Sequence, residues 1–397
     1  MEKKIKTGVL GATGMVGQKY LTLLANHPWF DVVYLAASPN SAGKTYAEAV
    51  AGRWHMKENL PEKYKNIVVE DAANIGKASG KCSLIFSAVE MEKQQILATE
   101  LEYAKQGFAV VSNNSAHRST DDVPVMIPEI NPDHLNIIAD QRKHYGWGKG
   151  LLVVKPNCSI QSYMIPLFAL MKAGYKIDRM IVTTLQALSG AGYPGPAAID
   201  LVDNTIPYIG GEEEKSEVEP RKVFGAIKNG KIVSDESMKI SAHCNRVPVT
   251  DGHSACCSIG FAGKKPEIPE IIDIWRSFKA LPQELKLPSA PDPVLVYRDE
   301  VNRYIDVVRE FKIEAVRLLE LGQKPASQLA LELGVQRNRL YKWQAQLKAG
   351  KPLHAAPGRP RLEEESELTW LRREVARLKE ERDILKKAAA YFAKRRG

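Results

Sequence analysis

Cysteine is scarce in this sequence, and long apolar runs are absent. The 397 residues include five cysteines, none of them paired in a CxxC spacing. An odd number without that spacing predicts neither a disulfide framework nor a zinc site, and we expect no bound metal. No stretch is apolar over the roughly 20 residues that a membrane-spanning helix needs, and no signal-peptide core follows Met1. We therefore expect a cytoplasmic protein with no membrane partner.

Net charge is lacking over most of the chain. The formal charge of +9 comes from 56 Lys+Arg and 47 Asp+Glu, and residues 301–397 alone hold 22 and 13 of these. Residues 1–300 are therefore neutral overall. A neutral body followed by a basic tail predicts two parts with different partners, and the partner of the tail would be a polyanion.

A glycine-rich turn lies near the N-terminus. Residues 5–10 are a predicted strand, the sequence GATGMVG follows at 11–17, and apolar residues at helical spacing continue through Leu24. Glycines let the backbone approach a pyrophosphate, and the start of the helix receives its charge. This order of strand, glycine-rich turn and helix favours a nucleotide-binding site over a tight turn that binds no ligand. The residues of this unit that we expect to bind the cofactor are Gly11, Thr13, Gly14, Met15 and Val16.

The second predicted strand, residues 32–36, ends in a polar turn. An acidic residue there would bind the ribose 2′-hydroxyl of NAD, but residues 37–44 contain none. Ser38, Ser41 and Lys44 instead suit the 2′-phosphate of NADP. A solvated turn would show the same residue types, so NADP is favoured without excluding NAD.

Strands and helices alternate in the next segment. Predicted strands at 84–88 and 109–112 are separated by a predicted helix at 92–106, a pattern that indicates a parallel, doubly wound sheet. The polar loop 112–118 follows the second of these strands, at the edge where such sheets bind ligands. Its Arg118 suits a phosphate, although a solvated loop arginine fits the pattern equally well.

Cys158 lies where a strand turns into a helix. The apolar run 151–154 predicts a buried strand, and helical spacing continues from Ser159 to Met171, which would place Cys158 in the first helical turn. Unpaired N–H groups and the helix dipole favour a thiolate there. A nucleophile and a small buried hydrophobe remain equal alternatives from this context. His253 is the candidate acid/base partner, unless it is a core histidine.

Five motifs occur in an order that resembles one family. They are GATGMVG at 11–17, SNNS at 112–115, PNC at 156–158, QALSGAG at 186–192, and RVPV at 246–249 with His253. Residues from about 3 to 298 resemble aspartate-β-semialdehyde dehydrogenases of the archaeal and fungal-like branch. The resemblance implies a Rossmann-type α/β cofactor domain at 1–150 and an α+β catalytic and dimerisation domain at 151–298. It also implies a homo-oligomer, either a dimer or a tetramer.

The resemblance further implies a reaction and a set of site residues. The reaction is the NADP-dependent reductive dephosphorylation of L-aspartyl 4-phosphate to L-aspartate 4-semialdehyde, in the biosynthesis of lysine, threonine and methionine. Cys158 would form a thioester and His253 would act as acid/base. The other implied roles are Gln186 on the substrate carbonyl, Asn157 on the intermediate, Arg246 on the α-carboxylate, Glu213 on the α-amino group, Arg118 and Lys215 on phosphate, and Gly192 on the cofactor.

The sequence departs from the family pattern at two places. Asn40 stands where close relatives often have an arginine for the 2′-phosphate, and after Arg298 the expected further strand and final helix do not follow. Two other interpretations remain: a DNA-binding protein with an inactive dehydrogenase remnant, and an acyl reductase similar to malonyl-CoA reductase, which uses the same thioester chemistry.

The tail carries its own pattern. An amphipathic helix is predicted at 311–319 and two further helices at 326–333 and 335–347. Gly334 precedes the last helix, which is typical of a helix-turn-helix at 303–350. Residues suited to base edges and phosphates are Gln336, Arg337, Asn338, Arg339 and Lys342. Four heptads within 362–395 predict a coiled coil rather than a single packed helix. This region resembles the small DNA-binding proteins of insertion-sequence transposases, and the whole chain therefore resembles a fusion.

Overall fold

The computed structural model describes residues 4–299 without a break, and 316, 319–320, 325–332 and 337–348 of the tail. The chain divides into two compact units, Met1–Arg298 and Asp299–Gly397. The predicted coiled coil at 362–395 and Gln336 lie outside the described residues, and of Arg339 only the backbone is described.

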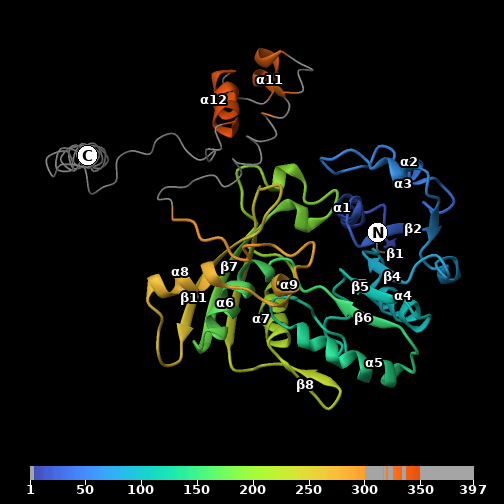
Figure 1. Ribbon diagram of the computed structural model, residues 1–397. Coiled ribbons are helices and arrows are strands. Elements are labelled where there is room, and N and C mark those ends of the chain that lie inside the picture. The colour runs from blue at the N-terminus through green and yellow to red at the C-terminus, as the bar shows by residue number, and fades with distance from the viewer. Residues whose placement is uncertain (1–3, 300–315, 317–318, 321–324, 333–336, 349–397) are drawn as a thin grey trace, which may run out of the picture. The chain divides into compact units, whose positions relative to one another are not determined.

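The first unit opens with a six-stranded parallel sheet in the order β3-β2-β1-β4-β5-β6 (Figure 1). Its strands are β1 (Ile5–Leu10), β2 (Phe30–Ala37), β3 (Val69–Asp71), β4 (Leu84–Ser87), β5 (Ala109–Ser112) and β6 (Leu151–Val154). The predicted doubly wound sheet is confirmed. The chain reverses direction across the sheet between β1 and β4, which pair in parallel, so a ligand crevice is expected at their carboxyl ends.

Apolar side chains cover both faces of this sheet. Leu21 of α1 (Met15–Leu24) packs with Leu35 and Tyr46 on one face. On the other face Val110 and Leu152 join a core that continues into the second half of the unit. Because both faces of the sheet are buried, its strands appear in the sequence as short runs of Val, Ile and Leu rather than as alternating apolar and polar residues. The other helices of this half are α2 (Tyr46–Ala49), α3 (Glu62–Lys65), α4 (Lys93–Lys105) and α5 (Ile138–Tyr145), with 3₁₀ turns η1 (Ile75–Lys77) and η2 (Pro132–Ile137).

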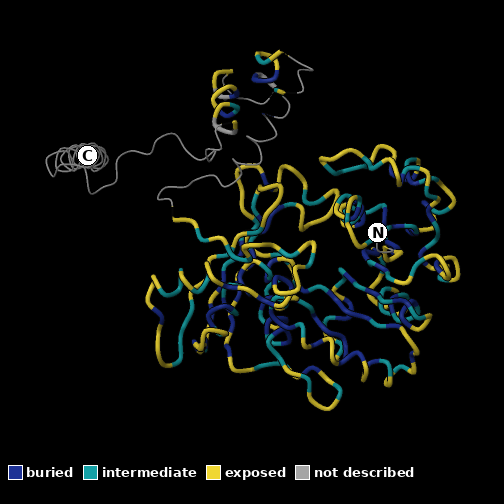
Figure 2. The backbone as a smooth tube through the Cα atoms, viewed as in Figure 1, coloured by how far each residue is buried: buried dark blue, intermediate teal, exposed yellow. Residues whose placement is uncertain are grey.

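A three-stranded sheet in the order β10-β7-β11 forms the second half of the unit. Strand β7 (Ile177–Gln186) is parallel to β10 (Lys239–Arg246) and antiparallel to β11 (Ser254–Phe261). Alternation along β7 buries Met180 and Val182 in the core that continues from the first sheet. Its other face leaves Ile181 52% exposed. Figure 2 shows that buried residues gather in the interior of the first unit, whereas exposed residues predominate in its loops.

Helices pack on one side of this second sheet. Helix α7 (Glu212–Val223) contacts β10, and α6 (Gln161–Lys172) contacts β11 and α8 (Ile268–Ser277). The remaining elements are η3 (Leu188–Ala191), η4 (Ala198–Asp200), the hairpin β8 (Ala226–Lys228) and β9 (Lys231–Val233), and α9 (Leu281–Glu284). No helix in the described part of the chain is long and apolar enough to cross a membrane.

The described part of the second unit contains α11 (Ala326–Glu332) and α12 (Arg337–Lys348). Leu329 and Ala330 of α11 pack with Leu340 and Trp343 of α12, and Val316 joins them. These two helices occupy the segments that the helix-turn-helix pattern predicts. A small separate core agrees with the division of the chain into two units.

Candidate active site

A cysteine and a histidine face each other in the second half of the first unit. The Nε2 atom of His253 lies 3.1 Å from the Sγ atom of Cys158. The Nδ1 atom of the ring accepts the N–H of Ala187 at 3.0 Å, so the ring proton lies on Nε2 and Nε2–H donates to the sulfur. Burial, and secondly the charge of Arg246, lower the pKa of His253 below its ordinary value. The ring is therefore neutral near pH 7.

The turn that carries Cys158 differs from the sequence expectation. Cys158 was expected in the first helical turn, but it lies in a turn before α6 and its side chain is exposed. The Oδ1 atom of Asn157 accepts both the backbone N–H and the hydroxyl of Ser159, at 2.8 and 2.9 Å. These local bonds compete with helical hydrogen bonding and delay the helix until Gln161.

Arg246 joins the pair from the end of β10. Its guanidinium is almost fully buried and donates to the carbonyl oxygen of Ala187 at 2.7 Å. A Cβ atom added to Gly190 would lie 3.0 Å from His253 and 3.1 Å from Arg246. Gly190 thus allows the 188–191 turn to approach both side chains, and it brings the predicted acid/base and the predicted carboxylate ligand to one place.

Glu212, which the sequence analysis did not single out, is the carboxylate in contact with this site. It accepts from Asn157 Nδ2 at 2.8 Å and from Gln186 Nε2 at 3.3 Å, and it pairs with Lys215 Nζ at 2.8 Å. Burial raises the pKa of the Glu212 carboxyl, but these hydrogen bonds and the charge of Lys215 outweigh burial and lower it. Glu212 is therefore ionised.

Glu213, the residue expected to bind the α-amino group, points toward β10. Its Oε1 atom accepts the backbone N–H of Cys244 at 3.1 Å. Neighbouring helical residues diverge by about 100°, so the first turn of α7 can present only one of the two glutamates to Asn157. The signal in the sequence was the spacing Glu212, Lys215, Glu219, which is one face of a helix.

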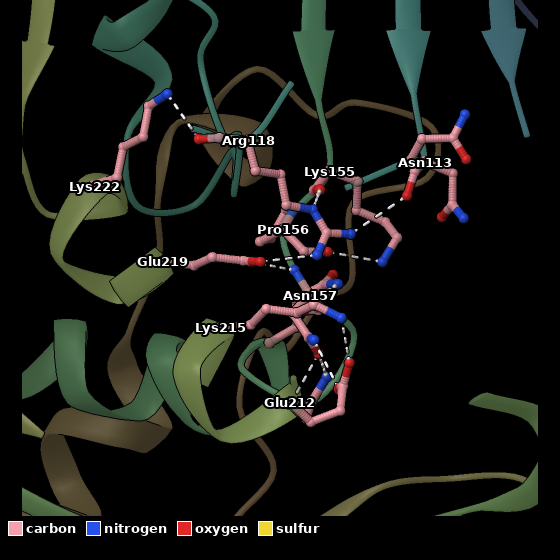
Figure 3. Close-up of polar contacts among 12 residues, drawn as sticks. Asn113, Arg118, Lys155, Pro156, Asn157, Glu212, Lys215, Glu219 and Lys222 are labelled. Carbon is pink, nitrogen blue, oxygen red and sulfur yellow. Dashed lines mark hydrogen bonds and ion pairs between the residues drawn. The ribbon is translucent and has the colours of Figure 1, made fainter. Parts of the chain in front are cut away.

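Arg118 is clamped by the protein rather than solvated (Figure 3). Its side chain is 11% exposed, and Nη1 pairs with Glu219 Oε1 at 2.9 Å. Nε donates to the carbonyl oxygen of Lys155 at 2.9 Å and Nη2 to that of Asn113 at 3.4 Å. The second oxygen of Glu219 accepts the backbone N–H of Asn157 at 2.6 Å. Glu219 thus links the predicted phosphate ligand to the segment before Cys158.

This link predicts the effect of replacing Glu219. Glu219→Ala would leave the buried Arg118 charge without its counter-charge and the buried Asn157 N–H without an acceptor, and we expect the free energy of unfolding to fall by about 3 kcal/mol. Urea unfolding measures this. Glu236→Ala is the matched control, because Glu236 pairs with Arg221 of the same helix at 2.7 Å but its side chain is 67% exposed. Glu236→Ala should lower the free energy of unfolding by less than about 1 kcal/mol. Equal decreases in the free energy of unfolding of the two variants would contradict the linking role of Glu219.

The glycine-rich turn has the shape that a dinucleotide needs. A Cβ atom on Gly11 would lie 2.1 Å from the carbonyl oxygen of Ala88, and one on Gly17 would lie 2.1 Å from that of Gly11. Both glycines therefore permit close backbone packing. Helix α1 begins at Met15 with Gly14 as N-cap, and has neither a side-chain cap nor an acidic residue in its first turn. Its positive end suits the pyrophosphate of NADP.

The other predicted cofactor-binding residues differ in their exposure to solvent. Val16 and Ser38 are exposed, and Thr13 is half-buried. Ser41 is only 1% exposed, and its hydroxyl oxygen accepts from Arg53 Nη2 at 2.9 Å. Gly192 lies on the exposed loop after η3, with φ +71°. All five cysteines are free thiols, and among the described residues no cluster of His, Cys, Asp or Glu is placed to bind a metal.

A doubly wound sheet with a glycine-rich turn and a cysteine–histidine pair is typical of a dinucleotide-dependent dehydrogenase. Residues 6–138 match the model of the semialdehyde dehydrogenase NAD binding domain, and residues 167–312 match that of the semialdehyde dehydrogenase dimerisation domain. The chain belongs to the aspartate-semialdehyde dehydrogenase family. Residues 308–381 match a transposase model, so the chain joins a dehydrogenase segment to a transposase-type segment.

Individual relatives agree with this assignment. The aspartate-semialdehyde dehydrogenase of Cryptococcus neoformans is 39% identical over 307 residues, which cover 76% of this chain and 82% of the relative. That of Archaeoglobus fulgidus is 40% identical over 304 residues, covering 76% and 83%. The structure of the Candida albicans enzyme with NADP superposes with a TM-score of 0.64 at 36% identity, covering 72% of this chain and 79% of that one.

Proposed function

We propose that the first unit catalyses the NADP-dependent reductive dephosphorylation of L-aspartyl 4-phosphate to L-aspartate 4-semialdehyde. The observation that carries the proposal is the 3.1 Å contact between Cys158 Sγ and His253 Nε2, beside Gln186, Glu212 and Arg246. The activity of the named relatives and the match to the NAD binding domain support it.

Cys158 and His253 carry out the covalent steps. The Cys158 thiolate attacks the acyl carbon and the C–S bond forms, and the C–O bond to phosphate breaks as the tetrahedral intermediate collapses. Phosphate leaves with the electron pair of that bond and takes its proton from solvent. When bound, NADPH supplies the hydride that reduces the thioester. The Nε2–H group of His253 donates to the oxyanion in each tetrahedral state, and the aldehyde then departs from the sulfur, which is restored as a thiolate.

The surrounding side chains fit an amino acid bearing a phosphate. Arg246 is assigned to the α-carboxylate, because a planar guanidinium binds a carboxylate through two N–H groups. Glu212 is assigned to the α-amino group in place of Glu213, since it is ionised and lies at the site. Arg118 and Lys215 are assigned to phosphate, and Gln186 and Asn157 to the carbonyl oxygen.

The reverse reaction tests the proposal most directly. Wild-type protein with aspartate semialdehyde, phosphate and NADP is expected to form NADPH, followed by absorbance, and the rate should depend on phosphate. Omission of phosphate and the Cys158→Ala variant are the controls. Folded protein that gives no phosphate-dependent NADPH would refute the proposal.

The partners and location follow from the same reasoning. The second family model is a dimerisation domain, and β7 exposes one face with Ile181 at 52%. We propose a homo-oligomer, dimeric or tetrameric, to be measured by light scattering. A free nucleophilic thiol needs a reducing compartment, which supports a cytoplasmic location.

A second function is favoured for the tail. The described side chains Arg337, Asn338 and Lys342 of α12 are exposed, while Leu340 and Trp343 are buried beneath them. Helix α12 therefore has a polar outer face that suits a major groove. Together with the transposase match, this supports DNA binding by residues 303–350, with Gln336 and Arg339 as further candidate contacts and the coiled coil at 362–395 as a predicted self-association segment.

Salt dependence tests DNA binding by the full chain. Fluorescence anisotropy with a labelled mixed-sequence duplex is expected to show an affinity that falls steeply with salt. Neutralising Arg337 and Lys342 to glutamine should reduce the slope of log affinity against log salt by about 2. Replacing the exposed Lys77 and Lys286 of the first unit is the matched control, since it removes the same charge. If both double variants lower the slope equally, the DNA is attracted to the charge of the whole chain, and the assignment of binding to α12 is wrong.

A further inference from the structure

Arg53 lies beside the turn where the ribose of a dinucleotide is expected. Strand β2 ends at Ala37, and the turn 38–41 follows at the carboxyl edge of the sheet, next to β1. The Nη2 atom of Arg53 donates to the buried Oγ of Ser41 at 2.9 Å, and Nε donates to the carbonyl oxygen of Ala49 at 2.8 Å. Two of five N–H donors are thus used to hold the guanidinium in place.

The remaining donors of Arg53 are available to an anion. Arg53 is exposed, and among the described residues no carboxylate lies within ion-pair distance of it. Asn40 of the same turn is neutral, and Lys44 donates its Nζ to the carbonyl oxygen of Asn40 at 2.9 Å. An anchored guanidinium therefore lies beside the turn in which an enzyme selective for NAD would have a carboxylate.

A buried glutamine fixes Arg53 relative to the glycine-rich turn. Gln18 of α1 is fully buried, and its Nε2 donates to the carbonyl oxygens of Thr13 and Arg53 at 2.9 and 2.8 Å. Its Oε1 accepts the N–H of His55 at 2.8 Å. One side chain thus joins the turn expected to hold the pyrophosphate to the segment that carries Arg53. The spacing between the two anion sites is set by the fold rather than by a flexible loop.

We propose that Arg53 binds the 2′-phosphate of NADP and sets the preference for NADP over NAD. It supplies the positive charge that Asn40 does not, with Ser41 holding the guanidinium rather than contacting phosphate itself. The inference rests on the proposed cofactor. A guanidinium donates several parallel N–H groups to one phosphate, which makes it a better ligand than the ammonium of Lys44.

Direct binding of the two reduced cofactors tests this assignment without turnover. Arg53→Gln is expected to raise the Kd for NADPH by about 10- to 100-fold and to change that for NADH by less than about twofold. The Kd of Arg53→Lys for NADPH should lie between those of the wild type and Arg53→Gln, because lysine keeps the positive charge but lacks the planar guanidinium. Kd is measured by titrating nicotinamide fluorescence. Lys57→Gln is the matched control: Lys57 is on the same segment, carries the same charge and is 86% exposed. It should leave both constants unchanged.

The outcomes separate the proposal from its premise. An equal loss of NADPH and NADH affinity would make Arg53 a support for the turn and overturn the proposal, as would an unchanged preference. Wild-type protein that binds neither cofactor would overturn the proposed function together with this inference. Tight NADPH binding that survives Arg53→Gln would overturn this inference alone.

Discussion

Replacing Cys158 by alanine is expected to lower phosphate-dependent turnover by about 10⁴-fold or more, because no other group at the site can form the thioester. The free energy of unfolding should change by less than about 0.5 kcal/mol. Cys158 is exposed, and the turn around it is held by Asn157 and Ser159 rather than by the thiol. Initial rates of NADPH formation and urea unfolding give the two quantities.

Selective alkylation provides an independent test of the same residue. Burial raises the pKa of the half-buried Cys82 thiol to about 11, so few thiolates form there near neutral pH. Iodoacetamide should therefore modify Cys158 before Cys82, and activity should be lost in proportion to the modification of Cys158, as peptide mass spectrometry would show. Cys256→Ala is the control, since Cys256 is exposed and is not among the residues placed at the site. Inactivation that tracks another cysteine would refute the assignment of the nucleophile.

The sequence predicted the first sheet well because its signals are local. Each strand is a short apolar run, and each polar motif directly follows a strand, as GATGMVG follows β1 and residues 155–158 follow β6. Parallel strands bring these carboxyl ends to one edge, so motif order alone indicates which residues meet. His253 and Cys158 are 95 residues apart, so the local sequence offered His253 only as a candidate partner, and the family resemblance assigned it the role.

The sequence could not resolve contacts that depend on the angle of a side chain. Glu212 and Glu213 are adjacent and chemically identical, and only the start of α7 decides which one meets Asn157. The sequence could not distinguish Arg118 as a phosphate ligand from a solvated loop residue, because its partner Glu219 lies 101 residues away. Arg53 belongs to no motif, and its contact with Ser41 arises from the path of the chain after α2.

Replacing His253 by glutamine is expected to lower kcat by about 10²- to 10³-fold, since the glutamine amide does not reproduce the position from which the imidazole N–H donates to the sulfur and to each oxyanion. In the wild type, a falling pH adds a proton to Nδ1, which can then no longer accept the N–H of Ala187, and the ring loses the hydrogen bond that orients it toward Cys158. Because burial and the charge of Arg246 lower the pKa of the ring below 6.5, this loss of activity should occur only below that pH. Glutamine does not titrate, so the acidic limb of the pH profile of kcat should flatten in the variant. His243→Gln on β10 is the control, and an acidic limb that persists unchanged in His253→Gln would assign it to another group.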